Sequence, residues 1–121
     1  MGYTTIFKGK INIDPPLSDS LDASLENLYD EQWSGKDVYP GKPPHRSYCQ
    51  WVVVEDGAAI EWDQGEKFYD SEQWMRYLIE QFLKPAGHVC NGTILAQGEE
   101  VGDVWKLHVK DNVVSVEDIG L

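Results

Sequence analysis

Residues 104–117 read VWKLHVKDNVVSVE, and this stretch decides the class of fold. Apolar and polar side chains alternate on both sides of Asp111 and Asn112, two residue types that tolerate the positive φ angles of a two-residue hairpin turn. Such a turn fixes the register of the strands that it joins, so Val109 is expected to face Val114. The stretch therefore predicts an antiparallel hairpin with one apolar face and one polar face.

The polar face of this hairpin carries its charged side chains. Lys106 lies opposite Glu117 in the predicted register, and we expect a cross-strand ion pair between them. His108 and Lys110 share the same face, and the sequence indicates no partner for the histidine. Such a face is expected to point toward solvent, because antiparallel sheets commonly leave one side uncovered.

Four further segments have the alternation, or the β-branched and aromatic composition, of strands. They are residues 3–13, 49–54, 58–62 and 89–97. Between the second and the third of these, residues 55–57 read Glu-Asp-Gly and form a predicted turn, because Gly57 can adopt a positive φ.

Two amphipathic helices are expected between the strands. The first covers residues 18–32, with Ser18 as its N-cap and leucines spaced by four and three residues as its core stripe. The second covers residues 70–83, with Asp70 as its N-cap and Gln73 as the capping-box partner. A long loop rich in proline and glycine follows the first helix.

The predicted order of elements is β-α-β-β-α-β-β-β. Its first six elements match the ferredoxin-like βαββαβ plan, and the last hairpin adds a further strand. We therefore predict an α+β fold in which an antiparallel sheet carries two helices on one face. A chain of 121 residues fits a single domain over residues 1–121.

The chain is strongly acidic, with 21 Asp and Glu against 10 Lys and Arg and a formal net charge of −11. This charge repels phosphate backbones and anionic membranes, which argues against direct binding to nucleic acid or membrane. The first residues lack the basic and apolar runs of a signal peptide, and no segment approaches the about 18 apolar residues of a membrane span. We expect a cytoplasmic protein whose two cysteines are reduced.

Four acids of the first predicted helix form a stripe of one sign. They are Asp19, Asp22, Glu26 and Asp30. Neighbours in such a stripe lie ~5–6 Å apart, close to the ~6–7 Å between successive phosphates along one DNA strand. Further acids are expected to help in binding, namely Glu55, Asp56, Asp63 and Glu66. Together these residues predict a surface that binds a basic protein partner.

The leading hypothesis is a small acidic inhibitor that mimics nucleic acid and occludes a basic, nucleic-acid-handling partner such as a nuclease. Anti-CRISPR, anti-restriction and nuclease-immunity proteins are of this type. The alternative is a structural or assembly module that forms a homodimer through its exposed sheet face. A third hypothesis is a carboxylate- or metal-dependent enzyme.

The residues that could serve catalysis or bind metal do not form a recognised motif. A zinc site would need two histidines and two cysteines, and the candidates are His45, Cys49, His88 and Cys90. Their spacings differ from those of common zinc modules, and we expect both cysteines to face the core. A nucleophile elbow, a P-loop and a GxGxxG motif are all missing. We therefore predict no catalytic residue, no metal site, no cofactor and no enzymatic activity.

Several motifs resemble those of a known family. They are CQWV (49–52), IEWD (60–63), GEKFY (65–69), WMRYLI (74–79), CNG (90–92), AQGE (96–99) and WKL (105–107). Together they resemble a family of small uncharacterised acidic proteins from actinobacteria and their phages, over most of residues 3–117. The resemblance implies a bacterial or phage origin, and it supplies neither an activity nor a catalytic residue.

Overall fold

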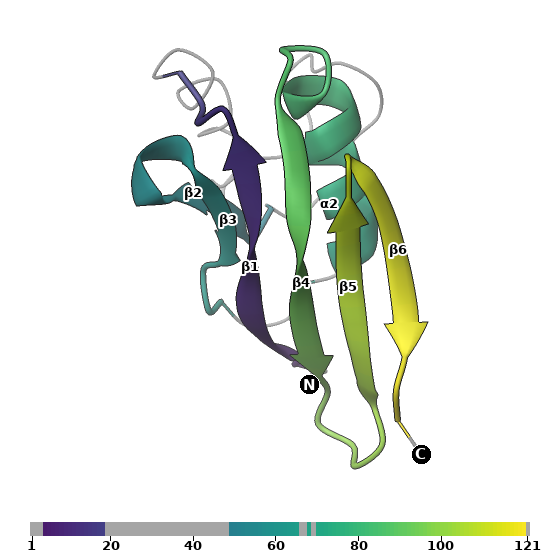
Figure 1. Cartoon of the computed structure of the whole chain (residues 1–121). Coiled ribbons are helices and arrows are strands. Elements are labelled where there is room, and N and C mark those ends of the chain that lie inside the picture. The colour runs from purple at the N-terminus through teal and green to yellow at the C-terminus, as the bar shows by residue number, and fades with distance from the viewer. Residues whose placement is uncertain (1–3, 19–48, 66–67, 69, 121) are drawn as a thin grey trace, which may run out of the picture.

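The computed structural model describes residues 4–18, 49–65, 68 and 70–120, which form a six-stranded antiparallel sheet with one α-helix (Figure 1). The strands are β1 Ile6–Asp14, β2 Trp51–Val54, β3 Ala59–Trp62, β4 Val89–Gln97, β5 Val104–Lys110 and β6 Val113–Asp118. Their order across the sheet is β2-β3-β1-β4-β5-β6. The strand β1 therefore joins the β2–β3 hairpin to the three C-terminal strands.

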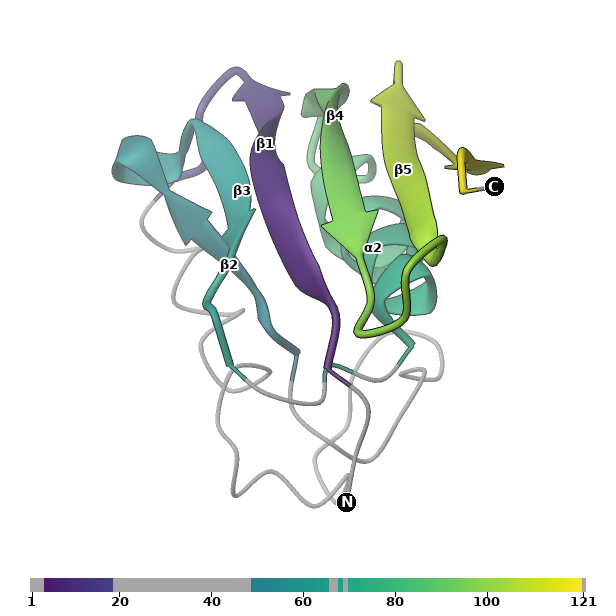
Figure 2. The ribbon, with the colours of Figure 1, turned by 90° about the horizontal axis from the view of Figure 1, so that it is seen from below.

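The helix α2 (Ser71–Leu78) continues directly into a π-helical turn, η3 (Ile79–Leu83). In this turn Lys84 N donates to the Ile79 carbonyl at 2.7 Å. Both elements lie against one face of the sheet, here called the inner face (Figure 2). Their buried stripe comprises Trp74, Met75, Leu78, Ile79, Phe82 and Leu83. The opposite side of the sheet is called the outer face.

The predicted ferredoxin-like plan with two helices on one face is wrong. The described residues form a six-stranded sheet with a single α-helix, α2. The first predicted helix lies outside them from residue 19 onward, as does the predicted loop that follows it. The sheet dominates because every segment with strand-like alternation pairs with a neighbour, and three of the strands follow α2 in sequence.

The predicted C-terminal hairpin is confirmed. Val109 faces Val114 in the β5–β6 ladder. Asp111 and Asn112 have φ angles of 48° and 70°, the left-handed values that a two-residue turn requires. Local sequence therefore sets both the turn and the register of these strands.

The turn between β5 and β6 is also fastened to the start of β4. The Asn112 side chain accepts a hydrogen bond from Cys90 N at 2.7 Å and donates one to the His88 carbonyl at 2.9 Å. The backbone N–H of Asp111 donates to Asn91 Oδ1 at 2.9 Å. These bonds satisfy backbone groups at the strand ends, which would otherwise depend on water.

The predicted side-chain cap of the second helix is wrong. Asp70 has a left-handed backbone with φ 56°, and its carboxylate makes no capping hydrogen bond, so it forms no capping box with Gln73. A capping side chain needs an extended backbone at this position, which the left-handed conformation does not supply. The first turn is instead closed by the backbone, where Trp74 N donates to the Asp70 carbonyl at 2.8 Å.

An aromatic cluster around Phe7 forms the core at one end of the inner face. The Phe7 ring packs edge-on against Trp51, Trp62, Phe68 and Trp105, with ring centroids 4.9, 5.5, 5.9 and 5.9 Å away. These rings come from β2, β3, β5 and the segment before α2. Phe7 therefore connects parts of the chain that are distant in sequence.

Gly9, in the middle of β1, is required by its surroundings. Its φ is +115°, which side chains rarely adopt, and a Cβ placed there would lie 2.7 Å from the Thr93 carbonyl oxygen. Gly87 has a similar φ of +90°, but a Cβ there would meet nothing within 4 Å. The two glycines thus differ in the space around them more than in their backbone.

We predict that Gly9→Ala destabilises the protein by about 2–4 kcal/mol, because backbone strain adds to a clash with a paired strand. The matched control Gly87→Ala carries the strain alone and should cost about 1 kcal/mol. Urea unfolding followed by tryptophan fluorescence measures both. Equal losses for the two variants would contradict the close approach of β1 and β4 at Gly9.

Candidate functional site

Most of the predicted partner-binding acids lie outside the described residues. These are Asp19, Asp22, Glu26 and Asp30 of the first predicted helix, together with Glu66. Their contribution to binding stays a prediction. The other predicted site residues, Glu55, Asp56 and Asp63, are described and can be placed.

The structure does not bring these three acids together. Glu55 and Asp56 lie in the turn before β3, whereas Asp63 follows the last residue of that strand. The Lys10 ammonium is 2.8 Å from Glu55 Oε2, so this carboxylate is neutralised across the sheet. Their hydrogen bond and charge attraction raise the pKa of Lys10. The three acids therefore do not form one negative patch.

Asp63 has a structural role in its own turn. Its Oδ1 accepts a hydrogen bond from Gly65 N at 2.7 Å. Partial burial raises the pKa of this carboxyl, and the hydrogen bond opposes the shift. A raised pKa often accompanies catalytic carboxylates, but here desolvation beside a tight turn explains it.

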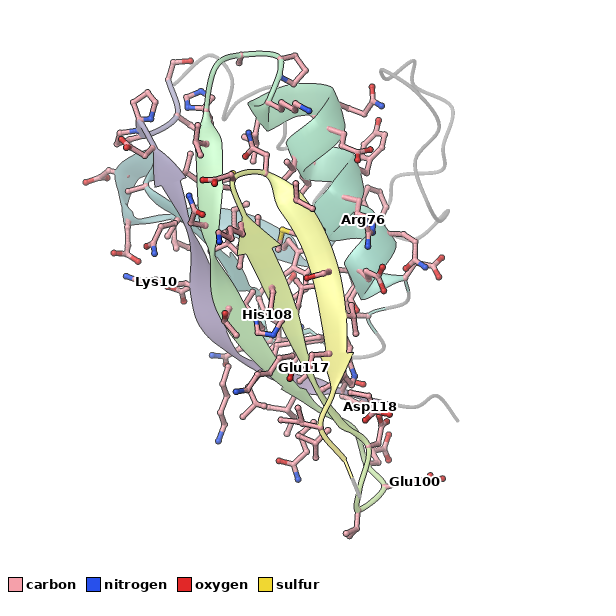
Figure 3. All side chains as sticks on the ribbon, turned by 45° about the vertical axis from the view of Figure 1, so that its right-hand side comes forward. Lys10, Arg76, Glu100, His108, Glu117 and Asp118 are labelled. Carbon is pink, nitrogen blue, oxygen red and sulfur yellow. The ribbon has the colours of Figure 1, made fainter. Side chains whose placement is uncertain are left out.

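A more compact acidic group lies at the end of the molecule where β4 turns into β5. We call it the acidic hairpin end, and its members are Glu99, Glu100, Asp103 and Asp118. Figure 3 shows Glu100 and Asp118 at this end. Val101, at the tip of the turn, is fully exposed at 104%. The sequence pattern marks residues 99–103 as acidic, but the approach of Asp118 follows only from the β5–β6 ladder.

The outer face of the sheet collects lysines. Alternation with the buried side chains of β1 and β5 directs four of them outward, namely Lys8, Lys10, Lys106 and Lys110. Exposed aliphatic side chains accompany them, including Ile6 at 52% and Val113 at 67% exposure. Arg76 and Lys84 are the basic residues that the described part of the chain places elsewhere. A chain of large negative charge thus has one face that is not acidic.

His108 links three strands on this outer face. Its Nδ1 lies 3.1 Å from Thr93 Oγ1, and its Nε2 lies 2.9 Å from Glu117 Oε1. A carboxylate only accepts, so Nε2 carries a hydrogen, and in the neutral ring Nδ1 accepts from the Thr93 hydroxyl. The predicted Lys106–Glu117 ion pair is therefore replaced by a His108–Glu117 pair.

The Thr93–His108–Glu117 chain has the connectivity of a nucleophile, a base and an orienting carboxylate. Catalysis by such a group is favoured where water is excluded. The His108 and Glu117 side chains are 35% and 57% exposed, and Thr93 is exposed as well. We interpret the chain as a cross-strand contact that orders the outer face.

A groove lies between β1 and β3. It has a volume of about 440 Å³. The described residues that line it are Ile6, Phe7, Lys8, Gly9, Glu61, Trp62 and Gln64. Sequence analysis does not indicate this groove, because it depends on how two strands that are distant in sequence separate.

The zinc hypothesis receives no support from the described residues, in which no three His, Cys, Asp or Glu side chains gather as metal ligands. His45 lies outside them. The His88 ring donates through Nδ1 to the Pro15 carbonyl, with 2.6 Å between the two atoms. Cys49 and Cys90 are buried free thiols in the core, which confirms the prediction for both.

Comparison of the chain with protein-family models, with curated proteins and with solved structures finds no match. The resemblance to the actinobacterial and phage family therefore stays a prediction. Within the described ranges, no helix has both the length and the apolar character needed to cross a membrane.

We predict that both thiols are inert in the native state. Cys49 and Cys90 are 0% exposed. Burial raises the pKa of the Cys90 thiol to about 11 and also raises that of Cys49. At pH 8 a disulfide reagent such as DTNB should label the native protein roughly a hundredfold or more slower than the urea-unfolded protein. Stoichiometric labelling of the native protein within seconds would show that a cysteine is accessible and reactive.

Proposed function

We propose that this chain is a small acidic binding protein, not an enzyme, that occludes a basic, nucleic-acid-handling protein. An anti-CRISPR, anti-restriction or nuclease-immunity protein is the specific form of this proposal. The observation that carries it is the separation of charge in the described residues. Lysines gather on the outer face, which leaves acids in excess on the helix side and at the hairpin end.

The helix side supports the proposal through its carboxylates. The acids of α2 and its surroundings are Asp70, Glu72 and Glu80. Arg76 offsets Glu72 alone, through a contact of 2.9 Å four residues along the helix. Lys84 directly follows η3, so the three acids outnumber the two bases of this side by one. A negative field increases the rate of encounter with a basic partner.

The acidic hairpin end supports it through its ordered backbone. Gly98 N donates to the Asp103 carbonyl at 2.8 Å, and Asp103 N donates to the Glu100 carbonyl at 3.1 Å. The Thr4 N–H also donates to the Glu99 carboxylate. Carboxylates on an ordered loop lose less conformational entropy on binding than carboxylates on a floppy one.

A homodimer joined through the outer face is the second candidate. The exposed side chains of Ile6, Val89 and Val113 favour it, because burying them stabilises an interface. The lysines of the same face oppose it, because two-fold symmetry places the same patch of each copy in contact. Light scattering after size exclusion distinguishes the candidates, and a dimer that persists in high salt would favour this one.

We predict that the immobilised chain retains basic proteins from a bacterial lysate at about 0.1 M salt and releases them at about 1 M salt. The Debye length falls from about 10 Å to about 3 Å over this range, so long-range attraction is lost. Double-stranded DNA should also displace them if they are nucleic-acid-handling proteins. Proteins retained at high salt and not displaced by DNA would contradict the proposal.

Charge reversal should locate the contact. We expect Glu100→Lys and the double substitution Asp22→Lys/Glu26→Lys each to reduce retention several-fold, because each turns an attraction into a repulsion. Lys106→Glu on the outer face is the matched control and should retain the partners as well as the original chain. Circular dichroism establishes that each variant is folded. Retention that simply follows net charge, with Lys106→Glu retaining more than the original chain, would show a general charge effect and no defined surface.

A further inference from the structure

The sheet has an open seam between β1 and β3. The ladder of these strands contains the pairs Ile11–Ile60 and Asn12–Ala59, and neither of the next two pairs in this register, Lys10–Glu61 and Gly9–Trp62, is formed. The opposite edge of β1 pairs with β4 from Ile6 to Asp14. The two halves of the sheet therefore diverge beyond Ile11, and the 440 Å³ groove occupies the divergence.

Backbone polar groups point into this groove from both sides. Ile13 N donates to the Ala58 carbonyl of the β2–β3 hairpin at 2.8 Å, and alternation along β1 directs Gly9 toward the same side. Asp63 N donates to the Gln50 carbonyl at 2.9 Å, so Trp62 is directed away from β2 and toward β1. Trp62 thus presents its backbone N–H and C=O groups toward the seam, and Gly9 lies on the other side of it with a φ of +115°.

The side chains of the groove give it an apolar floor and a charged rim. Phe7 and Trp62 form the floor, with ring centroids 5.5 Å apart. Lys8 and Glu61 line it from opposite strands. Glu61 contributes to the raised pKa of Lys10 and so lies within its field, whereas no ion pair is found for Lys8 within the described residues.

We propose that this seam binds an extended peptide segment of an acidic partner protein. The peptide would form backbone hydrogen bonds with the exposed strand edge, place one apolar side chain on the Phe7 and Trp62 rings, and direct a carboxylate to Lys8. Strand addition of this kind obtains affinity from the backbone and specificity from side-chain pockets. The volume falls within the about 300–1,000 Å³ of ligand sites.

Charge selects the partner. Two lysines of the outer face, Lys8 and Lys106, lie on either side of Leu95. Lys8 of β1 pairs with Leu95 of β4, and Leu95 pairs with Lys106 of β5, so the three residues form one row across the strands. A peptide with a carboxylate gains from this row, and a basic peptide is repelled by it. This site does not rest on the proposed function, since it takes a partner of opposite charge and is built from the residues between β1 and β3.

A synthetic peptide titration of the full chain tests the site. The probe is a blocked hexapeptide of threonine and valine with aspartate and phenylalanine at its centre. We expect saturable shifts of the Gly9 and Trp62 amide signals in ¹⁵N–¹H NMR spectra. Replacing the phenylalanine by asparagine, or introducing proline, should weaken binding about tenfold or more, because the apolar contact or the backbone donor is lost.

Matched variants connect the binding to the rim. Lys8→Glu should weaken binding of the acidic peptide about fivefold or more and improve binding of the peptide with lysine in place of aspartate. Lys110→Glu, at the other end of the outer face, should leave both affinities unchanged.

Three results would overturn the proposal. One is no saturable shift with any peptide at millimolar concentration, and another is an equal effect of Lys8→Glu and Lys110→Glu. The third is a shift of the seam signals with protein concentration alone, since this would make a second copy of the chain the occupant. Spectra of the free variants establish that each one retains the fold.

Discussion

The pairing of β1 on both of its edges is the constraint on which the rest of the structure depends. Its long ladder with β4 and its short ladder with β3 hold together two halves of the sheet, which no other strand pairing joins within the described residues. Where the β3 ladder ends, packing replaces hydrogen bonding, because Phe7 contacts rings from both halves. Trp51 Nε1 then donates to the Ser71 carbonyl at 2.7 Å and attaches the β2–β3 half to the start of the helix.

The same alternation that builds the core also sorts the charges. One side of β1 and β5 supplies apolar groups to the interior, and the other supplies lysines to the outer face. Most of the described acids lie in turns, in the helix and at the hairpin end, and Glu61 and Glu117 lie within strands. A protein of net charge −11 can therefore gather four of its lysines on one face without any basic domain.

Sequence reasoning succeeded where neighbours in sequence are neighbours in space. The β5–β6 register followed from Asp111 and Asn112, because a two-residue turn leaves no freedom in the pairing. It failed where side-chain geometry decides. Glu117 pairs with His108 instead of Lys106, and the left-handed backbone of Asp70 removes its capping role. The ferredoxin-like plan failed because it combined a correct set of strands with a two-helix layer that the described residues do not contain.

The candidate sites were harder to predict than the strands. The residues of the groove, such as Phe7 and Trp62, have the sequence pattern of ordinary core positions. They line a groove only because the β1–β3 ladder ends after two pairs. The acidic hairpin end was visible in part as a run of charge. The position of Asp118 beside that run is seen only in the structure, because the end of β6 pairs with the start of β5.

The position of Asn91 and Gly92 within β4 has a consequence for the chemical lifetime of the protein. Where glycine follows asparagine, the backbone nitrogen of the glycine readily attacks the side-chain carboxamide of the asparagine, because glycine has no side chain to hinder it. The product is a succinimide, whose hydrolysis leaves a deamidated residue. Here Gly92 pairs with Ile11 of β1 and with Val109 of β5, and Asn91 Oδ1 accepts a hydrogen bond from Asp111 N. The ring can close only when the central strands open, so the rate of this ageing reaction is tied to the unfolding of the sheet itself.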